Sequence, residues 1–203
     1  MSKIDTKAVE GKVAGNPVSG GTNLVVCAYE GTDGQLSKVW EKMTGVKPVV
    51  ITVEPDADIR DILAGIIADN NISDDFILVP ANCVPCAKIS IGELATPLVF
   101  LDVQGNKVFS ERLPKPFSKE KLVDALPAEN QTAEEFLKDY FKKNLHRPIE
   151  AGFRFSNIVT PVYRANPCEH LVIEAFVRKK FVFATPQGYA AITHLIDQYL
   201  LNE

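Results

Sequence analysis

The chain lacks several features that mark whole classes of protein. None of its apolar runs approaches the ~20 residues that a membrane-spanning helix requires. Cysteine is scarce, with 4 residues in 203, too few for a disulfide-stabilised scaffold of this length. The amino terminus has no basic stretch followed by an apolar one, the pattern of a secretion signal. We therefore expect a cytoplasmic protein without a transmembrane segment.

Positive charge is not in excess either. The 22 lysines and arginines are outnumbered by 26 acidic residues, which gives a formal net charge of -4. Binding to nucleic acid needs a basic face, so the composition speaks against a nucleic-acid partner. A hydrophobic content of 46% is enough for a packed core. We expect residues 1–22, rich in glycine and polar residues, to form a flexible leader, and residues 23–203 to form a single α/β domain.

The first half alternates apolar runs with amphipathic segments. Residues 23–29, 49–53 and 76–79 have the length and composition of buried strands. A helix is expected over residues 35–43, and another after Asp56, which would cap it. This second helix has apolar residues along one face: Ile59, Ile62, Leu63, Ile66 and Ile67. The βαβαβ order predicts a Rossmann-like, mainly parallel sheet flanked by helices.

The second half has a mixed character. Residues 97–100 and 107–109 flank a turn-rich stretch typical of a hairpin. A short helix is expected from Ser118, and a longer one after Thr132, which forms a capping-box pattern with Glu135. The remaining expected elements follow in order: extended chain over 150–164, a helix over 167–179, a strand over 180–184 and a final helix after Gly188.

Residues 73–86, SDDFILVPANCVPC, contain the most informative short pattern. The apolar run ends at Pro80 and is followed by Asn82 and a Cys-x-x-Cys pair. In open α/β sheets, ligands bind just past the carboxyl ends of such strands. We therefore expect the functional site near residues 80–88. Three interpretations compete for it: a degenerate site for a sugar nucleotide and metal, a redox dithiol, and half of a zinc site.

The two cysteine interpretations each meet an objection. A redox dithiol has its first cysteine at a helix amino terminus. Thr96-Pro97 with the hairpin after it superficially resembles the end of a thioredoxin-like domain, but only nine residues separate Cys86 from Thr96, too few for the helix, strand and helix required between them. A zinc site would need Cys83 and Cys86 together with Cys168 and His170, whose spacing is tighter than usual. A packing role for reduced thiols is favoured over both a redox and a zinc role. The sequence leaves these three roles of the cysteines open.

Two segments resemble GT-A glycosyltransferases, which transfer sugars from nucleoside-diphosphate donors. Residues 58–86 resemble the family's central segment, a helix carrying Arg and Gly followed by a strand that ends in an Asp-x-Asp metal motif. Residues 152–170, GFRFSNIVTPVYRANPCEH, resemble the later region in which paired arginines precede an acidic residue at a helix start. The resemblance covers roughly residues 23–185. It implies a GT-A-like fold and a nucleoside-diphosphate sugar as the ligand.

The resemblance also implies roles for individual residues. The first strand and the turn after it would hold the nucleotide base, which makes Tyr29 and Glu30 binding candidates, and Arg60 is the helical arginine of the central segment. Glu169 would be the general base that deprotonates an acceptor hydroxyl in an inverting displacement. Arg164 precedes it as a further binding residue.

The expected metal motif is degenerate. Where two aspartates should follow the strand, the sequence reads Pro80-Ala81-Asn82-Cys83. Asn82 is a poor ligand for the Mn²⁺ or Mg²⁺ cofactor that the resemblance implies, because a hard cation prefers charged oxygen ligands. Lys88 is the nearest cation that would offset phosphate charge instead. Two interpretations stay open, a metal-independent transferase and a non-catalytic binding module. The sequence predicts neither an oligomeric state nor the identity of the sugar.

Overall fold

A computed structural model describes residues 22–95, 113–126, 131–144 and 166–202, together with short strands at residues 100–101, 107–108, 153–154 and 159–162. The expected leader lies outside the described residues, except for Thr22. None of the helices in the described segments has the length and apolar character needed to cross a membrane.

Strands and helices alternate along the chain. The strands are β1 (Asn23–Ala28), β2 (Val49–Thr52), β3 (Asp75–Val79), β4 (Cys83–Pro85), β5 (Phe100–Leu101), β6 (Lys107–Val108), β7 (Lys115–Ser118), β8 (Phe153–Arg154), β9 (Val159–Val162) and β10 (Phe181–Ala184). The helices are α1 (Asp33–Thr44), α2 (Ile59–Ala68), α3 (Ile91–Leu94), α4 (Lys119–Ala125), α5 (Ala133–Asn144), α6 (Glu169–Arg178) and α7 (Pro186–Ile196), followed by a π-helical turn, Asp197–Leu201.

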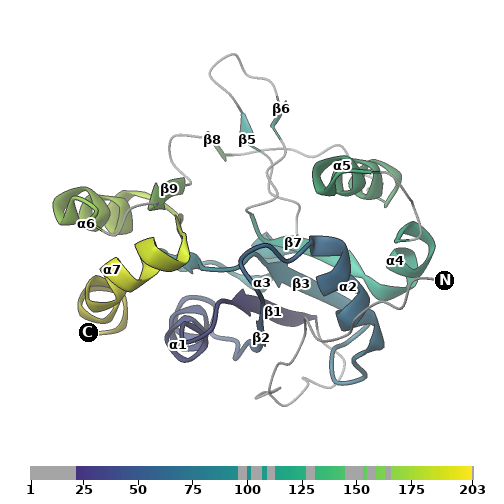
Figure 1. The fold of residues 1–203 in the computed structure, drawn as a ribbon, viewed down its shortest axis with the longest axis horizontal. Coiled ribbons are helices and arrows are strands. Elements are labelled where there is room, and N and C mark those ends of the chain that lie inside the picture. Colours follow the sequence, from purple (N-terminus) through teal and green to yellow (C-terminus); the bar gives the residue numbers. More distant parts are fainter. Residues whose placement is uncertain are drawn as a thin grey trace.

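The main sheet has four strands in the order β2-β1-β3-β7. β1 pairs in parallel with both β2 and β3, whereas β7 is antiparallel to β3. The chain leaves β1 toward one edge to form β2 and then crosses back to form β3 on the other side of β1. The expected α/β class, with a mostly parallel sheet flanked by helices, is confirmed. Figure 1 shows α1, α6 and α7 on one side of this sheet and α4 and α5 on the other.

The core has two layers, one on each face of the main sheet. Alternating side chains of β1 supply both layers because successive residues of a strand point to opposite faces. Val25 and Cys27 pack in the layer that contains α2, α4 and α5. Leu24 and Val26 pack in the layer that contains α1, α6 and α7.

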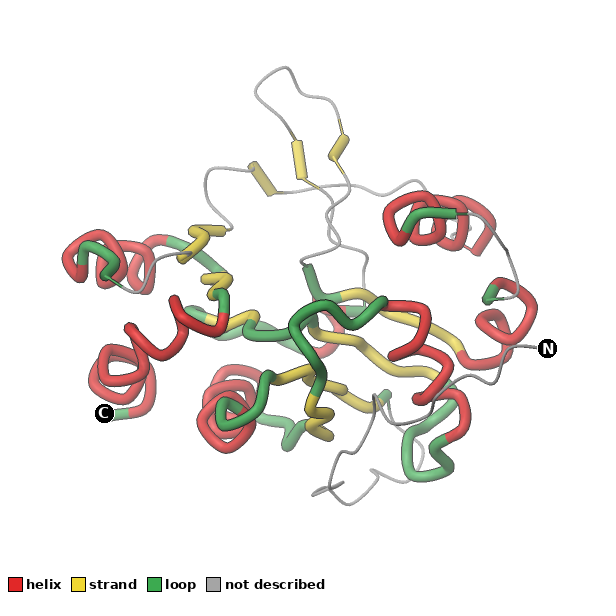
Figure 2. Tube along the Cα trace, in the orientation of Figure 1, coloured by secondary structure: helices red, strands yellow, loops and turns green. Residues whose placement is uncertain are grey.

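The remaining strands form two three-stranded sheets. Their orders are β4-β10-β9 and β6-β5-β8, and the expected hairpin is confirmed by the antiparallel pairing of β5 with β6. Figure 2 shows these short strands apart from those of the main sheet. Trp40 joins the first of them to α1, because its indole N–H donates to the Cys83 carbonyl at 2.9 Å and its ring stacks on Phe181.

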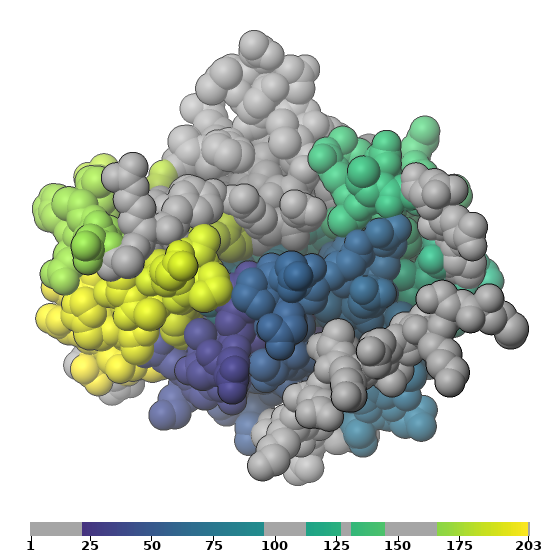
Figure 3. Space-filling view, in the orientation of Figure 1, coloured from purple at the N-terminus to yellow at the C-terminus, as the bar shows by residue number. Residues whose placement is uncertain are grey.

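The carboxyl-terminal segment packs on α1. Gln35 donates to the Thr193 carbonyl at 3.0 Å and to the Asp197 carboxylate at 2.7 Å. Its own side-chain oxygen accepts from the Tyr189 hydroxyl at 2.7 Å. The space-filling view shows the yellow carboxyl-terminal helices directly against the purple amino-terminal segment (Figure 3). The carboxyl-terminal segment and α1 thus pack together in one layer of the core.

Four helix starts differ from the sequence-based expectation: α1 begins two residues earlier and α6 two residues later than expected, and the starts of α2 and α7 have identifiable causes. α2 is capped by Asp58 instead of Asp56, because the Asp58 carboxylate accepts from the Arg60 backbone N–H at 2.8 Å. α7 begins before Gly188, since the Thr185 hydroxyl accepts from the Gly188 N–H at 3.1 Å and a proline occupies the first helical position. The strands β4 and β7 and the short helix α3 were not expected at all.

Candidate functional site

A pocket of about 410 Å³ lies at the carboxyl ends of the three parallel strands. Tyr29 follows β1, Glu54 follows β2, and Pro80 and Ala81 follow β3, and all four line the pocket. Because β2 and β3 lie on either side of β1, this is the point where the order of strands reverses. Open α/β sheets bind ligands at such points, and the volume is in the usual range for ligand pockets, about 300–1,000 Å³.

The inner wall of the pocket is apolar. It belongs to the α2 layer of the core, to which Cys27, Leu78 and Phe117 contribute from three neighbouring strands. The other walls come from the start of α2, from Ala133 at the start of α5, and from Thr185, which caps α7. The pocket is therefore shaped by helix starts on one side and by strand ends on the other.

Lys115 introduces a positive charge into this wall. It lies at the start of β7, opposite Leu78 in the antiparallel pairing with β3, so that both side chains point to the same face. Its exposed fraction is only 2%, and its ammonium donates to the Leu113 carbonyl at 2.8 Å. Sequence reasoning missed this residue. The available signal was the alternation in KPFS, which puts Lys115 on the same face as the apolar Phe117.

The opposite end of the pocket carries acidic side chains. Glu54 and Asp58 line it at the end of β2 and at the cap of α2. Asp58 forms an ion pair with Arg60 at 2.7 Å, and the hydrogen bond from that guanidinium lowers the pKa of the Asp58 carboxyl. The pair is about one-third exposed, so solvent weakens its contribution to stability.

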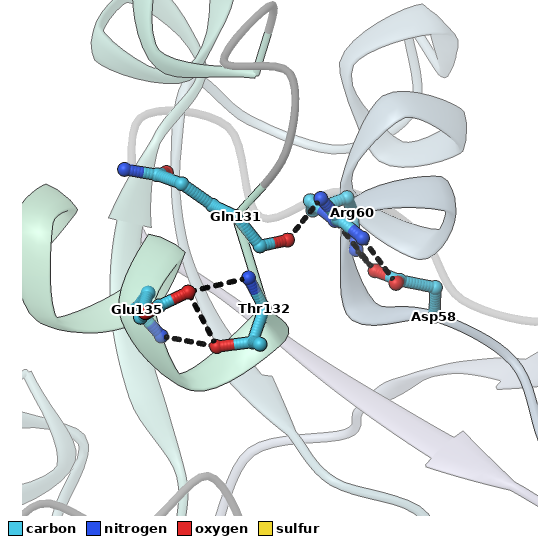
Figure 4. Close-up of polar contacts among 5 residues, drawn as sticks. All are labelled: Asp58, Arg60, Gln131, Thr132 and Glu135. Carbon is cyan, nitrogen blue, oxygen red and sulfur yellow. Dashed lines mark hydrogen bonds and ion pairs between the residues drawn. The ribbon is translucent and has the colours of Figure 1, made fainter.

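Arg60 also links two parts of the pocket wall. Its guanidinium donates to the Gln131 carbonyl at 2.8 Å, immediately before α5 (Figure 4). There the Thr132 hydroxyl accepts from the Glu135 N–H, and the Glu135 carboxylate accepts from the Thr132 N–H, which confirms the expected capping box. The expected binding residue Arg60 thus joins the start of α2 to the start of α5 beside the pocket.

Asn82 has its polar groups directed into the protein. It is fully buried, with the left-handed backbone angle φ 52°. Its Oδ1 accepts from the Thr32 hydroxyl at 2.8 Å and from the Tyr29 N–H at 3.5 Å, while its carbonyl accepts from the Ala184 N–H at 3.2 Å. Within the described part of the chain, its Nδ2 has no hydrogen-bond partner. Asn82 connects the ends of β1 and β10 to the turn before α1.

These residues do not fit the divalent cation that the resemblance implies. Asn82 supplies a neutral oxygen that already accepts two hydrogen bonds, and the side chain is not part of the pocket wall. Of the carboxylates that line the pocket, Asp58 is already paired with Arg60. Mn²⁺ and Mg²⁺ require several oxygen ligands that converge on one point, with charged ones preferred.

Two other expected site residues, Lys88 and Glu30, are not brought together with the pocket, and the position of a third is not described. Lys88 is exposed on a separate surface, where its ammonium contacts the Lys42 carbonyl. Glu30 is exposed in the turn after β1 and does not line the pocket. Arg164 lies outside the described residues.

Glu169 lies on another part of the surface. It begins α6, with its side chain 62% exposed, and its carboxylate is 3.2 Å from the His194 imidazole. His194 is in the last turn of α7, about 13 Å along the helix axis from the pocket residue Thr185 at 1.5 Å per residue. The role of general base therefore stays a prediction, without a geometric link to the pocket.

The cysteine pair has the environment of core residues. Cys83 lies in β4 and is fully buried, Cys86 follows it half-buried, and both are free thiols. Burial raises the pKa of both thiols, and the nearby positive charge of Lys115 opposes this only in part at Cys83. A reactive dithiol needs the opposite shift. For the zinc alternative, the described residues contain no group of three or more His, Cys, Asp or Glu that could hold a metal ion.

Comparison with known proteins adds no family to this description: neither a protein-family model nor a curated protein matches the chain.

Proposed function

We propose that the chain binds a nucleoside-diphosphate sugar in the pocket at the carboxyl ends of β1, β2 and β3. The observation that carries the proposal is the position of the pocket, at the reversal of strand order in a mostly parallel sheet. The resemblance of residues 58–86 and 152–170 to GT-A glycosyltransferases gives the same ligand class. The finer assignment to a Rossmann-like, GT-A-like fold is part of this proposal.

The nucleoside would bind near the end of β1 and β2. Tyr29 lines the pocket there and offers an aromatic ring for stacking on a base. Glu54, at the end of β2, offers a carboxylate for ribose hydroxyls. An acidic residue roughly 20 residues after the first turn serves this purpose in other doubly wound nucleotide-binding sheets. A ring for base stacking and a carboxylate for ribose hydroxyls are thus available at the ends of the adjacent strands β1 and β2.

A non-catalytic binding module on the same fold is the second candidate. It is favoured by the position of Glu169, which pairs with His194 at 3.2 Å outside the pocket. Donor binding does not depend on this residue, whereas sugar transfer through the expected base does. Sugar transfer is accordingly a separate proposal, and the binding experiment below does not assume it.

Calorimetric titration of the full chain with UDP- and GDP-sugars, with EDTA or Mn²⁺ present, tests donor binding. We expect saturable binding of at least one nucleotide sugar. Tyr29→Ala should weaken it about 5- to 150-fold, the range expected for a lost base stack of about 1–3 kcal/mol. The matched control is Tyr199→Ala, which removes a 45% exposed tyrosine of the carboxyl-terminal turn. No binding of any nucleotide sugar, or equal losses in both variants, would reject the proposal.

A further inference from the structure

We propose that a second pocket, beside the β7 edge of the main sheet, binds a small zwitterion, a free α-amino acid with an apolar side chain. This pocket has a volume of about 300 Å³, and Phe117 belongs to its wall as well as to the wall of the first pocket. The volume is at the lower end of the usual range for ligand pockets, about 300–1,000 Å³, and so suits a small ligand. The inference does not depend on a nucleotide ligand.

Strand pairing brings the polar residues of this pocket together. Asp75 begins β3 and is paired with Ser118, the last residue of β7, so both side chains project from the same face of the sheet. Lys121 follows Ser118 by three residues, in the first turn of α4. All three residues line the pocket. Among the described strands, β7 is at the edge of the main sheet, so the pocket is flanked by α4 and α5 and not by a further strand (Figure 1).

Tyr140 of α5 adds a buried hydroxyl group to the wall. The residue is 4% exposed, and its hydroxyl oxygen accepts from the Ser118 backbone N–H at 3.1 Å. No residue of the described segments accepts the proton of this hydroxyl. Burial, and then the negative charge of Asp75, raise the pKa of Tyr140, so the hydroxyl stays protonated at neutral pH. A buried donor without an acceptor is unfavourable, and a ligand in the pocket would supply the acceptor.

The pocket carries one charge of each sign. Asp75 and Lys121 both line it, and neither forms an ion pair with the other or with any other described residue. An anion alone would be repelled by the Asp75 carboxylate, and a cation alone by the Lys121 ammonium. A zwitterion satisfies both, because its ammonium donates to Asp75 and its carboxylate accepts from Lys121 and Tyr140. The ammonium and carboxylate of a free α-amino acid are attached to one carbon atom, which suits a pocket of this size.

The rest of the wall suits an apolar side chain on the ligand. It includes three phenylalanines together with a proline and an alanine: Phe76, Phe117, Phe141, Pro116 and Ala95. The ring of Phe117 lies 5.7 Å from that of Phe76 and 5.4 Å from that of Phe141, so the three rings form one cluster. An aliphatic or aromatic group in contact with these rings is removed from water, which favours binding. Apolar amino acids should therefore bind more tightly than glycine.

Calorimetric titration of the full chain with free amino acids tests the inference. The probes are L-leucine, L-methionine, L-phenylalanine and glycine. We expect saturable binding of at least one of the three apolar amino acids, about tenfold or more tighter than that of glycine. The amide of the amino acid that binds lacks the negative charge, and its N-acetyl derivative lacks the positive charge. Each derivative should bind about tenfold or more weakly than the free amino acid.

Three variants remove the polar groups of the pocket one at a time. Asp75→Asn, Lys121→Gln and Tyr140→Phe should each weaken binding of the free amino acid about tenfold or more. The matched controls are Asp124→Asn on α4 and Lys142→Gln on α5, both exposed and outside the pocket wall, which should keep the native affinity within about twofold. Circular dichroism and urea unfolding check that each variant folds. If Tyr140→Phe does not fold, the two variants of the exposed residues Asp75 and Lys121 decide the test.

Several outcomes overturn the inference. The first is the absence of saturable binding of all three apolar amino acids to native protein. The second is an affinity that does not change in Asp75→Asn or in Lys121→Gln, and the third is a derivative with a single charge that binds as tightly as the free amino acid. Failure of the proposed function is distinguishable: amino-acid binding without binding of any nucleotide sugar supports the second pocket and rejects the donor site, and the reverse result rejects the second pocket alone.

Discussion

The Oδ1 atom of Asn82, in the turn after β3, lies 2.8 Å from the hydroxyl of Thr32, which precedes α1 and donates a hydrogen bond to it. In the family that residues 58–86 resemble, metal-binding aspartates follow the strand at this point, and this chain has Asn82 there. A carboxylate in the same place would be fully buried, which is unfavourable for a charged group. Asparagine makes the same contact without that charge. The position has a structural use that is incompatible with the expected metal site.

The backbone at Asn82 gives the first prediction. Its φ of 52° is in the left-handed region, which asparagine and glycine adopt with less strain than alanine does. Both Asn82→Ala and Asn82→Gly lose the contact with Thr32, so their difference isolates the backbone term. We expect Asn82→Ala to be less stable than Asn82→Gly by about 1 kcal/mol in urea unfolding. Equal stabilities would contradict a left-handed conformation at this residue.

The Asp58–Arg60 pair gives a prediction that depends on pH. The pKa of Asp58 is lowered in the folded state, chiefly by the Arg60 hydrogen bond, relative to about 3.9 for a free aspartate. The pair therefore stabilises the fold above about pH 4, and this contribution is lost as the pH falls through the folded-state pKa. Asp58→Ala, which also removes the helix cap, should lower the free energy of unfolding by about 1–2 kcal/mol at pH 7.

The same variants separate the charge from the cap. Asp58→Asn keeps an acceptor for the Arg60 N–H and removes the charge, so it should lose less stability than Asp58→Ala at pH 7. The stability gap between native protein and Asp58→Asn should narrow in urea unfolding as the pH falls from 7 to 3, because the unfolded chain takes up a proton at this carboxyl before the folded protein does. A gap that does not change between pH 7 and pH 3 would show that the ion pair contributes nothing.

Thiol reactivity tests the environment of the four cysteines. Burial raises the pKa of Cys27 to about 12 and that of Cys83 well above its ordinary value, while Cys168 is exposed. Reaction with an aromatic disulfide reagent at pH 8 should modify one thiol quickly in native protein and all four in denaturant. Cys168→Ser should remove the fast phase. Rapid modification of Cys83 or Cys86 would instead support the dithiol interpretation.

Trp40 gives a prediction for the core. It is the single tryptophan of the chain and is fully buried, with its indole N–H bonded to the Cys83 carbonyl at 2.9 Å. Trp40→Phe retains an aromatic ring but leaves this carbonyl without the indole donor, so we expect a loss of about 1–3 kcal/mol in the free energy of unfolding. Thermal and urea unfolding followed by circular dichroism measure it. A change below about 0.5 kcal/mol would mean that the hydrogen bond is not formed in solution.

Local patterns predicted the first half of the fold well. The spacing of apolar residues within a single element is enough to identify it in five cases: β1, α1, β2, α2 and β3. The capping box of Thr132 and Glu135 was also readable, because its two partners are three residues apart. The start of α2 was placed too early because Asp56 and Asp58 are both acceptable caps, and only the observed bond to Arg60 distinguishes them.

The missed strands have partners that are distant in sequence. β4 is three residues long and pairs with β10, matching Cys83 with Phe183, and β7 pairs with β3. Both strands are short, and the alternation over the four residues of β7 is not enough to identify a strand without its partner. This is why Lys88 was selected and Lys115 was missed. Lys88 is closer to the expected motif in sequence, but the antiparallel pairing with β3 brings Lys115 to the pocket.

Glu169→Gln tests whether the acidic residue expected as a general base acts in sugar transfer. The Glu169–His194 pair is exposed, and neither residue lines the pocket. We therefore expect this variant to change the free energy of unfolding by less than ~1 kcal/mol and to bind nucleotide sugars as native protein does. Glu174→Gln, which breaks the exposed pair with Arg178 on the same helix, is the matched control. The rate of sugar hydrolysis or transfer is then measured in both variants. A rate that falls in Glu169→Gln but not in Glu174→Gln, with donor affinity unchanged, would establish Glu169 as the base and reject the non-catalytic module.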